Sequence, residues 1–174
     1  MNRQELENTL RDLDRRLSAP CDVIVVGGAA MILWFGANRA TRDIDVIPLR
    51  GGWTEVRRGA EAVARDRGLP LDWIADAAKA FADVLPPDSS DRLIPLDLGL
   101  TQLRAFIPGL PDLVALKAVA LREQDLEDLE LLAPRVTEDD KMVLARTVEH
   151  LAKLRPDWAQ KLHYFLLEKG WQTD

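Results

Sequence analysis

Residues 26–47 read VGGAAMILWFGANRATRDIDVI, and this stretch decides the fold of the chain. An apolar run ends in Gly27 and Gly28, and a segment of helical character follows them. Asp43 and Asp45 then stand two residues apart at the start of a second apolar run. Because residues two apart in a strand face the same side, we expect these carboxylates to project together from a buried strand.

The two carboxylates indicate a metal site. Side by side they repel each other unless a cation lies between them, and hard oxygen ligands suit Mg²⁺, with Mn²⁺ as the alternative ion. We therefore predict that Asp43 and Asp45 bind a divalent metal. The other interpretation is a pair of surface acids on an edge strand. It is disfavoured because the neighbouring residues are apolar, and buried acids need partners.

The glycine pair indicates a phosphate site beside the metal. Gly27 and Gly28 have no side chains, so the backbone can approach a ligand closely, and the helix after them offers N–H groups without helical partners. The other interpretation is a tight turn from strand to helix. The combination of the glycine pair with the two acids favours the binding of a triphosphate.

The pattern of the remaining chain predicts an open α/β sheet. The sequence suggests helix 3–18, strand 22–26, helix 29–35, strand 42–48, helix 53–67, strand 69–74, helix 76–84, strands 92–96 and 102–108, helix 111–132 with a break near 122–124, and helices 137–154 and 156–169. We expect one domain over 1–132 and a C-terminal helical extension over 133–174 that packs on it.

Composition is that of an ordinary globular protein. Apolar residues make up 47% of the 174 residues and charged residues 30%. No apolar run approaches the roughly 20 residues that span a bilayer, and the start of the chain is polar, so we expect a cytoplasmic protein without membrane contact. Cys21 is the only cysteine, and we interpret it as a buried thiol.

The charge is acidic overall and uneven along the chain. A net charge of −6 argues against a broad nucleic-acid surface. Arginines nevertheless outnumber acids between Arg39 and Arg67. This segment is either a local basic surface that holds a triphosphate or an RNA end, or a solvated helix face of mixed charge.

Two motifs together resemble a known family. The first is the string Arg-x-Thr-x-Asp-Ile-Asp at Arg39, Thr41, Asp43 and Asp45, and the second is DLVALKAVALREQDLED at 112–128. They resemble the nucleotidyltransferase superfamily of DNA polymerase β. The closer likeness is to the AbiEii/MenT class of type IV toxin–antitoxin systems and its small uncharacterised relatives. The matching segments cover roughly 22–48 and 110–132.

The resemblance implies a fold, a reaction and partners. The fold would be a nucleotidyltransferase fold with a mixed central sheet flanked by helices. The reaction would move an NMP from an NTP to a hydroxyl acceptor, either a tRNA 3′ end or a protein. The chain would be a component of a toxin–antitoxin pair with a cognate antitoxin. A different acceptor class, a small molecule as in aminoglycoside nucleotidyltransferases, stays open.

The resemblance also assigns residues. Lys117 would bind the triphosphate, and Asp125 and Asp128 would belong to the active site, although both also fit a plain role at the start of a helix. We expect Arg39 either to order the loop before the metal strand by bridging to acids or to hold phosphate bidentately, and Thr41 to cap or to hydrogen-bond locally. From the sequence alone, Lys117 lies in an apolar helical stretch, so its ammonium must reach either water or a negative partner.

The superfamily usually supplies a third carboxylate from a neighbouring strand, and this chain has no obvious one. Asp72, in the expected strand 69–74, is our first candidate, and Asp97 and Asp125 come next. If no third acid reaches the metal, the alternative function is a catalytically weak or inactive module that binds nucleotide or a partner and regulates it. The tryptophans are more often core residues than platforms for a base, and Trp73, beside Asp72, is the one to test as a neighbour of the base.

Overall fold

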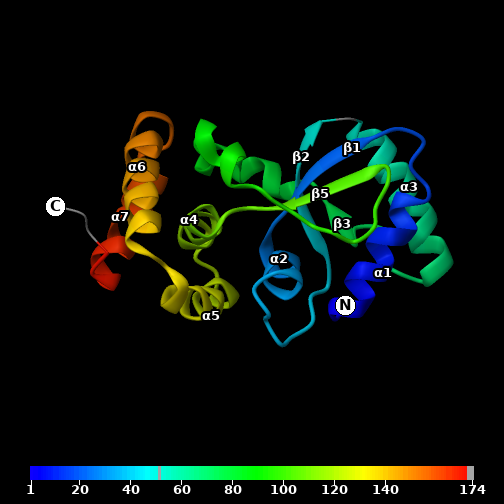
Figure 1. Cartoon of the computed structure of the whole chain (residues 1–174), viewed down its shortest axis with the longest axis horizontal. Helices are drawn as coiled ribbons and strands as arrows, with labels where there is room; N and C mark the ends of the chain where they lie inside the picture. The colour runs from blue at the N-terminus through cyan, green and yellow to red at the C-terminus, as the bar shows by residue number, and fades with distance from the viewer. Residues whose placement is uncertain (51, 172–174) are drawn as a thin grey trace. The chain divides into compact units, whose positions relative to one another are not determined.

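A mixed sheet forms the centre of the N-terminal part of the fold (Figure 1). The computed structural model describes residues 1–50 and 52–171. The strands within them are β1 (Cys21–Val25), β2 (Ile44–Arg50), β3 (Ile74–Ala75), β4 (Ile94–Pro95) and β5 (Leu103–Ile107), and they pair in the order β3-β2-β1-β5-β4. β1 runs antiparallel to β2 and parallel to β5, β3 runs parallel to β2, and β4 runs antiparallel to β5.

Helices flank this sheet and follow it in the chain. The α-helices are α1 (Arg3–Asp14), α2 (Gly27–Leu33), α3 (Trp53–Arg67), α4 (Leu110–Ala120), α5 (Glu123–Leu132), α6 (Glu138–Leu154) and α7 (Pro156–Lys169), with 3-10 segments η1 (Ala77–Val84), η2 (Pro87–Arg92) and η3 (Ala133–Arg135). The predicted α/β class, with a mixed sheet and C-terminal helices, is therefore confirmed. Among the described residues, no helix is both long and apolar enough to cross a membrane.

The chain forms two units that share its length unevenly. The sheet unit consists of Met1–Lys79 and Leu93–Ile107, and the helical unit consists of Ala80–Arg92 and Pro108–Asp174. The sequence-based bounds, 1–132 and 133–174, stay a prediction; the second range includes residues 172–174, which lie outside those described. The expected boundary falls within the helical unit, between α5 and α6.

In the sheet unit, α1 and α3 lie side by side (Figure 1). Asn2 caps α1, since its side chain accepts from the Glu5 backbone N–H while the Glu5 carboxylate accepts from the Asn2 N–H. Where the helices meet, a Cβ on Gly59 would lie 3.0 Å from Leu13 Cδ1. The glycine therefore lets α3 approach α1 closely.

In the helical unit, α4 is the central helix. Its apolar residues are spread around the helix instead of lying on one face, and nearly all of its residues are buried, the charged Asp112 and Lys117 included, which is typical of a helix enclosed by others. It contacts α5, α6 and α7. Residues 80–92 join this unit through Phe81, whose ring stacks on Trp158 at 5.2 Å, and through Arg92, whose guanidinium donates two 2.8 Å bonds to the buried Asp112 carboxylate.

Three expected elements differ from the structure, and one of them is the strand expected over 92–96, which is confined to Ile94–Pro95 because Arg92 ends the 3-10 segment before it. The strand expected over 69–74 is confined to Ile74–Ala75, because residues 70–73 form a turn in which the Trp73 N–H donates to Pro70 O. The helix expected over 76–84 is a 3-10 segment. The break expected near 122–124 is confirmed: α4 ends at Leu121, the only non-glycine residue with positive φ (47°) in the described part of the chain.

A buried carboxylate ties the end of α1 to the start of β5. Asp14 accepts hydrogen bonds from the backbone N–H groups of Thr101, Gln102 and Leu103 at 2.7–3.1 Å, and from the Thr101 hydroxyl. Burial raises the pKa of the Asp14 carboxyl, but the N–H groups of Leu103, Gln102 and Thr101 outweigh it, and the net pKa lies below the usual 3.8. An acid at a helix C-terminus is otherwise unfavourable, so this contact explains its position.

We predict that Asp14→Asn lowers the free energy of unfolding by about 3 kcal/mol at neutral pH, because an amide cannot accept from all of these donors. Since the folded pKa is the lower one, the carboxylate's contribution is complete above the unfolded pKa of 3.8 and disappears as the pH falls through the folded value. Urea denaturation of both proteins across this pH range measures the difference. Asp66→Asn, which removes an exposed partner of Arg16, is the control; equal stability of all three proteins at neutral pH would contradict the prediction.

Candidate functional site

The pairing of β1 with β2 brings the glycine pair to the acidic pair. The two strands are antiparallel, so the residues that follow β1 lie beside the residues that begin β2. Val25 pairs with Val46, and the Val26 N–H donates to Asp45 O at 2.9 Å. Gly27, with φ +63°, then turns the chain into α2.

The side chains of the Arg-x-Thr-x-Asp-x-Asp string lie directly against the two glycines. A Cβ on Gly27 would lie 3.1 Å from Asp45 Oδ2. A Cβ on Gly28 would lie 3.1 Å from Thr41 Oγ1 and 3.2 Å from Arg39 Nη1. The structure therefore groups five predicted residues in one place, and it shows that the glycines make room for the carboxylate, hydroxyl and guanidinium of this chain.

The two acids of the string have similar surroundings. Asp43 and Asp45 are half-buried, while Ile44 between them is fully buried, which follows the alternation of a strand. The Thr41 hydroxyl donates to Asp43 O at 3.2 Å, and the Ile44 N–H donates to Trp73 O at 2.7 Å. These contacts hold the segment that leads into β2, so the backbone that carries both carboxylates is fixed on either side.

The candidates for a third carboxylate lie elsewhere. Asp72 belongs to the turn before β3, and its side chain is 67% exposed and pairs with Arg42 at 3.4 Å. In the β2–β3 register the residue opposite Asp45 is Ala75, which carries no ligand atom. Asp97 is exposed in the segment after β4. Within residues 1–50 and 52–171, no three or more His, Cys, Asp or Glu side chains gather as a metal site.

The residues present fit Mg²⁺ with two protein ligands. Mg²⁺ prefers oxygen ligands and is commonly bound by one or two carboxylates together with substrate phosphates. Asp43 and Asp45 supply such carboxylates, and the Asp45 carboxylate lies beside the glycine turn. The donor set therefore suits an ion shared between the protein and a phosphate chain.

The other predicted residues belong to the helical unit. Lys117, Asp125 and Asp128 are all buried, and Lys117 Nζ donates to Asp125 Oδ1 at 2.8 Å and to Asp128 Oδ2 at 2.6 Å. Lys117 thus has the negative partner that its apolar surroundings require, and the partners come from α5. The structure groups the predicted residues in two sets, one in each unit.

Three further side chains can be placed in the structure. Trp73 is fully buried and its indole N–H donates to Ala60 O at 2.9 Å, so it is a core residue that packs on α3 and not a surface for a base. Cys21 is buried, as expected, and burial raises the pKa of its thiol, which keeps it protonated. Trp34, in the loop between α2 and β2, is the large aromatic residue that is exposed near the site in sequence.

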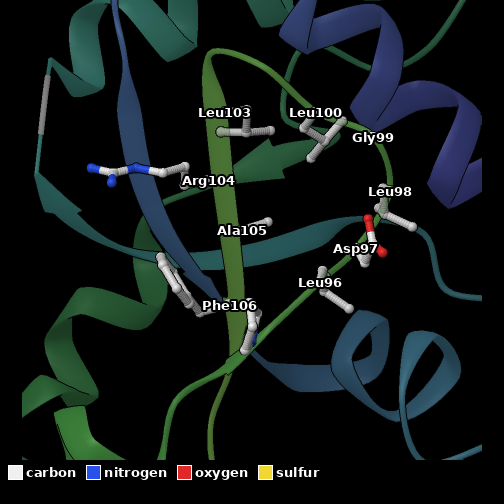
Figure 2. Close-up of a pocket in the computed structure, with 10 residues that line it drawn as sticks. Leu96, Asp97, Leu98, Gly99, Leu100, Leu103, Arg104, Ala105 and Phe106 are labelled. Atoms are coloured by element: carbon white, nitrogen blue, oxygen red, sulfur yellow. The ribbon is translucent and has the colours of Figure 1, made fainter.

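A cavity of about 230 Å³ lies in the sheet unit beside β5 (Figure 2). Its lining comes from 95–100 and 103–106 and is mostly apolar. Asp97 is the one acid in this lining, while Arg104 is bound by Asp22 through two 2.7 Å hydrogen bonds. None of the residues of the glycine turn or of the acidic pair lines this cavity.

Comparison with known proteins identifies the family. The model of a family described as nucleotidyltransferase of unknown function (DUF6036) matches residues 4–163. The chain therefore belongs to this nucleotidyltransferase family. No curated protein and no solved structure matches the chain. The closer resemblance to the AbiEii/MenT class stays a prediction.

We predict that Gly27→Ala weakens the binding of Mg²⁺ or Mn²⁺ about tenfold or more, as loss of a supporting contact at a metal site does, because the new methyl group meets the Asp45 carboxylate. Gly68→Ala is the matched control: its φ of +67° imposes the same backbone strain, but its Cβ meets nothing within 4 Å. Titration calorimetry measures the affinity. Equal metal affinity in the two variants would show that the contact with Asp45 is irrelevant.

Proposed function

We propose that this member of the nucleotidyltransferase family transfers an NMP from an NTP to a hydroxyl acceptor, with Mg²⁺ bound by Asp43 and Asp45. The observation that carries the proposal is the contact between the Asp45 carboxylate and the glycine turn. A side chain on residue 27 would crowd Asp45 Oδ2, so this carboxylate oxygen lies directly against the glycine. An ion bound there and a phosphate chain approaching the glycines would meet at one point.

The residues around the glycine turn have different roles in binding the metal and the triphosphate. Asp43 and Asp45 would hold the metal. The bound ion would neutralise the negative charge of the triphosphate and the negative charge that develops on it during transfer. Arg39, whose guanidinium lies against Gly28, supports binding of the same phosphates through charge-assisted hydrogen bonds. Thr41 orients the acidic pair, since its hydroxyl holds the Asp43 carbonyl.

The reaction is a displacement at the α-phosphorus. The acceptor oxygen forms a bond to this phosphorus while the bond to the bridging oxygen of the β-phosphate breaks. Pyrophosphate leaves with the electron pair, and the hydroxyl proton passes to water. The protein's contribution is position and charge, as is usual for phosphoryl-type transfer.

The distribution of charge between the two units favours one class of acceptor. The sheet unit contains thirteen basic and thirteen acidic residues, so the net charge of −6 lies entirely in the helical unit. Metal binding by Asp43 and Asp45 would leave the sheet unit positive. This supports contact with a short phosphate-bearing end of a substrate, such as a tRNA 3′ end, more than with an extended RNA surface. A protein acceptor and a role beside an antitoxin remain part of the proposal through the family resemblance.

One observation favours a second function. Among the described residues, no three or more His, Cys, Asp or Glu side chains gather as a metal site, whereas two-metal transfer clamps both the attacking and the leaving oxygen. A protein with this site can bind a metal–nucleotide complex and regulate a partner without turnover. Binding without transfer would identify this function.

We predict that wild-type protein, incubated with Mg²⁺, an α-³²P-labelled NTP and total tRNA or protein extract, labels an acceptor. Asp43→Asn and Asp45→Asn each reduce the labelling about a hundredfold or more, because the metal loses a ligand. Gel electrophoresis with nuclease- and protease-treated samples identifies the acceptor class. Asp66→Asn, an exposed acid on α3, is the control and keeps full labelling.

The variant Asp72→Asn tests the third ligand in the same assay. Its exposed carboxylate pairs with Arg42, so we expect it to retain most of the activity. A loss as large as that of Asp43→Asn would restore Asp72 as a metal ligand. Labelling that survives in both Asp43→Asn and Asp45→Asn would end the proposal.

A further inference from the structure

The connection between α2 and β2, residues 34–43, carries the motif that leads into the acidic pair. Arg39, Thr41 and Asp43 all lie in it. Connections outside helices and strands are usually more mobile than the elements that they join. Carboxylates that share a metal ion must nevertheless be held in a precise arrangement. The site therefore needs contacts that fix this connection between its two ends.

Within this connection, the backbone of Thr41 is paired with the backbone of Met1. The Thr41 N–H donates to Met1 O at 2.9 Å, and Met1 N donates to Thr41 O. Two residues that exchange both hydrogen bonds in this way form the pair that joins neighbouring antiparallel strands. Met1 thus gives the connection a backbone partner of the kind that a strand would supply, and in Figure 1 the start of the chain lies beside it.

Met1 is itself held in place by the fold. Residues at the start of a chain are poorly ordered unless contacts tie them down, and the Met1 side chain is only 7% exposed. The next residue, Asn2, caps α1 through its capping box. Leu6 and Leu10 of the same helix are fully buried in the core. α1 therefore holds Met1 at a fixed place in the sheet unit.

A second contact joins the start of α1 to the helix before the connection. Arg3 Nη1 lies 3.5 Å from Ile32 O in the last turn of α2, while Arg3 Nε donates to the Glu7 carboxylate at 3.1 Å. Carbonyl groups in the last turn of a helix lack helical partners and attract cations. Residues 1–3 therefore contact both the end of α2 and Thr41, so they hold the connection at two points.

We propose that Met1 is a positioning residue of the candidate site, which by pairing with Thr41 fixes the backbone that carries Asp43 and Asp45. The path from Met1 to the acids is short. The Thr41 hydroxyl donates to Asp43 O at 3.2 Å, and the same hydroxyl oxygen lies 3.1 Å from the position of a Cβ on Gly28. The inference rests on the proposed function, because it concerns the binding of the metal and the nucleotide.

Loss of the pairing would displace Thr41. This residue is half-buried, and backbone polar groups away from water need partners. Without Met1, the N–H and the carbonyl of Thr41 would turn towards water. That movement would carry the Thr41 hydroxyl away from Asp43 O and would loosen the packing against Gly28, so the carboxylates would lose their fixed arrangement.

The first test compares the wild-type chain with a chain that starts at Asn2, both released by a protease from the same N-terminal fusion. The shortened chain keeps the groups of the capping box and loses only Met1. In the metal-free protein we expect the Thr41 amide hydrogen to exchange about fivefold faster or more, as loss of one hydrogen bond implies. We expect calorimetry to show Mg²⁺ or Mn²⁺ binding about tenfold weaker, the lower end of the losses at residues that support metal ligands.

Asn2→Ala is the matched control. It keeps the Met1 backbone and removes the side chain that caps α1, so urea denaturation should show an unfolding equilibrium constant about fivefold higher. Metal affinity and the exchange of the Thr41 amide should stay at their wild-type values. A shortened chain that loses stability but keeps wild-type metal affinity would have lost a merely structural contact, and this result overturns the proposal.

A double-mutant cycle tests whether Met1 acts through Thr41. Thr41→Val removes the hydroxyl that holds Asp43 O and keeps the backbone pair with Met1. Since both changes remove the same support, we expect the shortened chain with Thr41→Val to bind the metal within about threefold of the weaker single variant. A loss of about a hundredfold, the product of two independent effects, would mean that Met1 acts by another route and overturns the proposal.

The exchange measurement separates this inference from the proposed function. Unchanged exchange of the Thr41 amide in the shortened chain overturns the pairing itself. Faster exchange with unchanged metal affinity overturns the positioning role. Wild-type protein that binds no metal contradicts the proposed function and removes the positioning role with it, while faster exchange in the shortened chain still supports the pairing of Met1 with Thr41.

Discussion

The antiparallel pairing of β1 with β2 is the constraint on which the candidate site depends. It places the glycines that end β1 beside the acids that begin β2, although a helix and a loop separate them in sequence. A pairing shifted by one residue would turn Asp43 and Asp45 to the other face of the sheet. The hydrogen bond from the Val26 N–H to Asp45 O marks the register at this point.

Sequence reasoning predicted this part of the structure well because the signals were local. The period of two around Ile44 and the glycines after an apolar run describe strands and a turn without reference to distant residues. The family match over 4–163 supports the nucleotidyltransferase assignment. The contacts of Arg39 and Thr41 with Gly28 were suggested by the motif, but their geometry was not predictable from it.

The features that sequence reasoning missed depend on distant partners. Asp72 had the spacing of a strand residue, yet the buried Trp73 and the turn at Pro70 move the start of β3 beyond it. The need of Lys117 for a negative partner was foreseen, but not that α5 supplies it. Asp14 gave no signal at all, because its donors lie more than eighty residues away. Tertiary contacts of this kind override local patterns.

The path of the chain between the two units has a consequence for any attempt to divide the protein. Neither unit is a continuous stretch, since residues 80–92 leave the sheet unit and residues 93–107 return to it. A fragment that stops after β5 would keep Phe81 and Arg92 while losing Trp158 and Asp112, the partners that receive them. Because of this interleaved path, no single cut of the gene would yield the whole sheet unit without residues 80–92, which would then lack their partners Trp158 and Asp112.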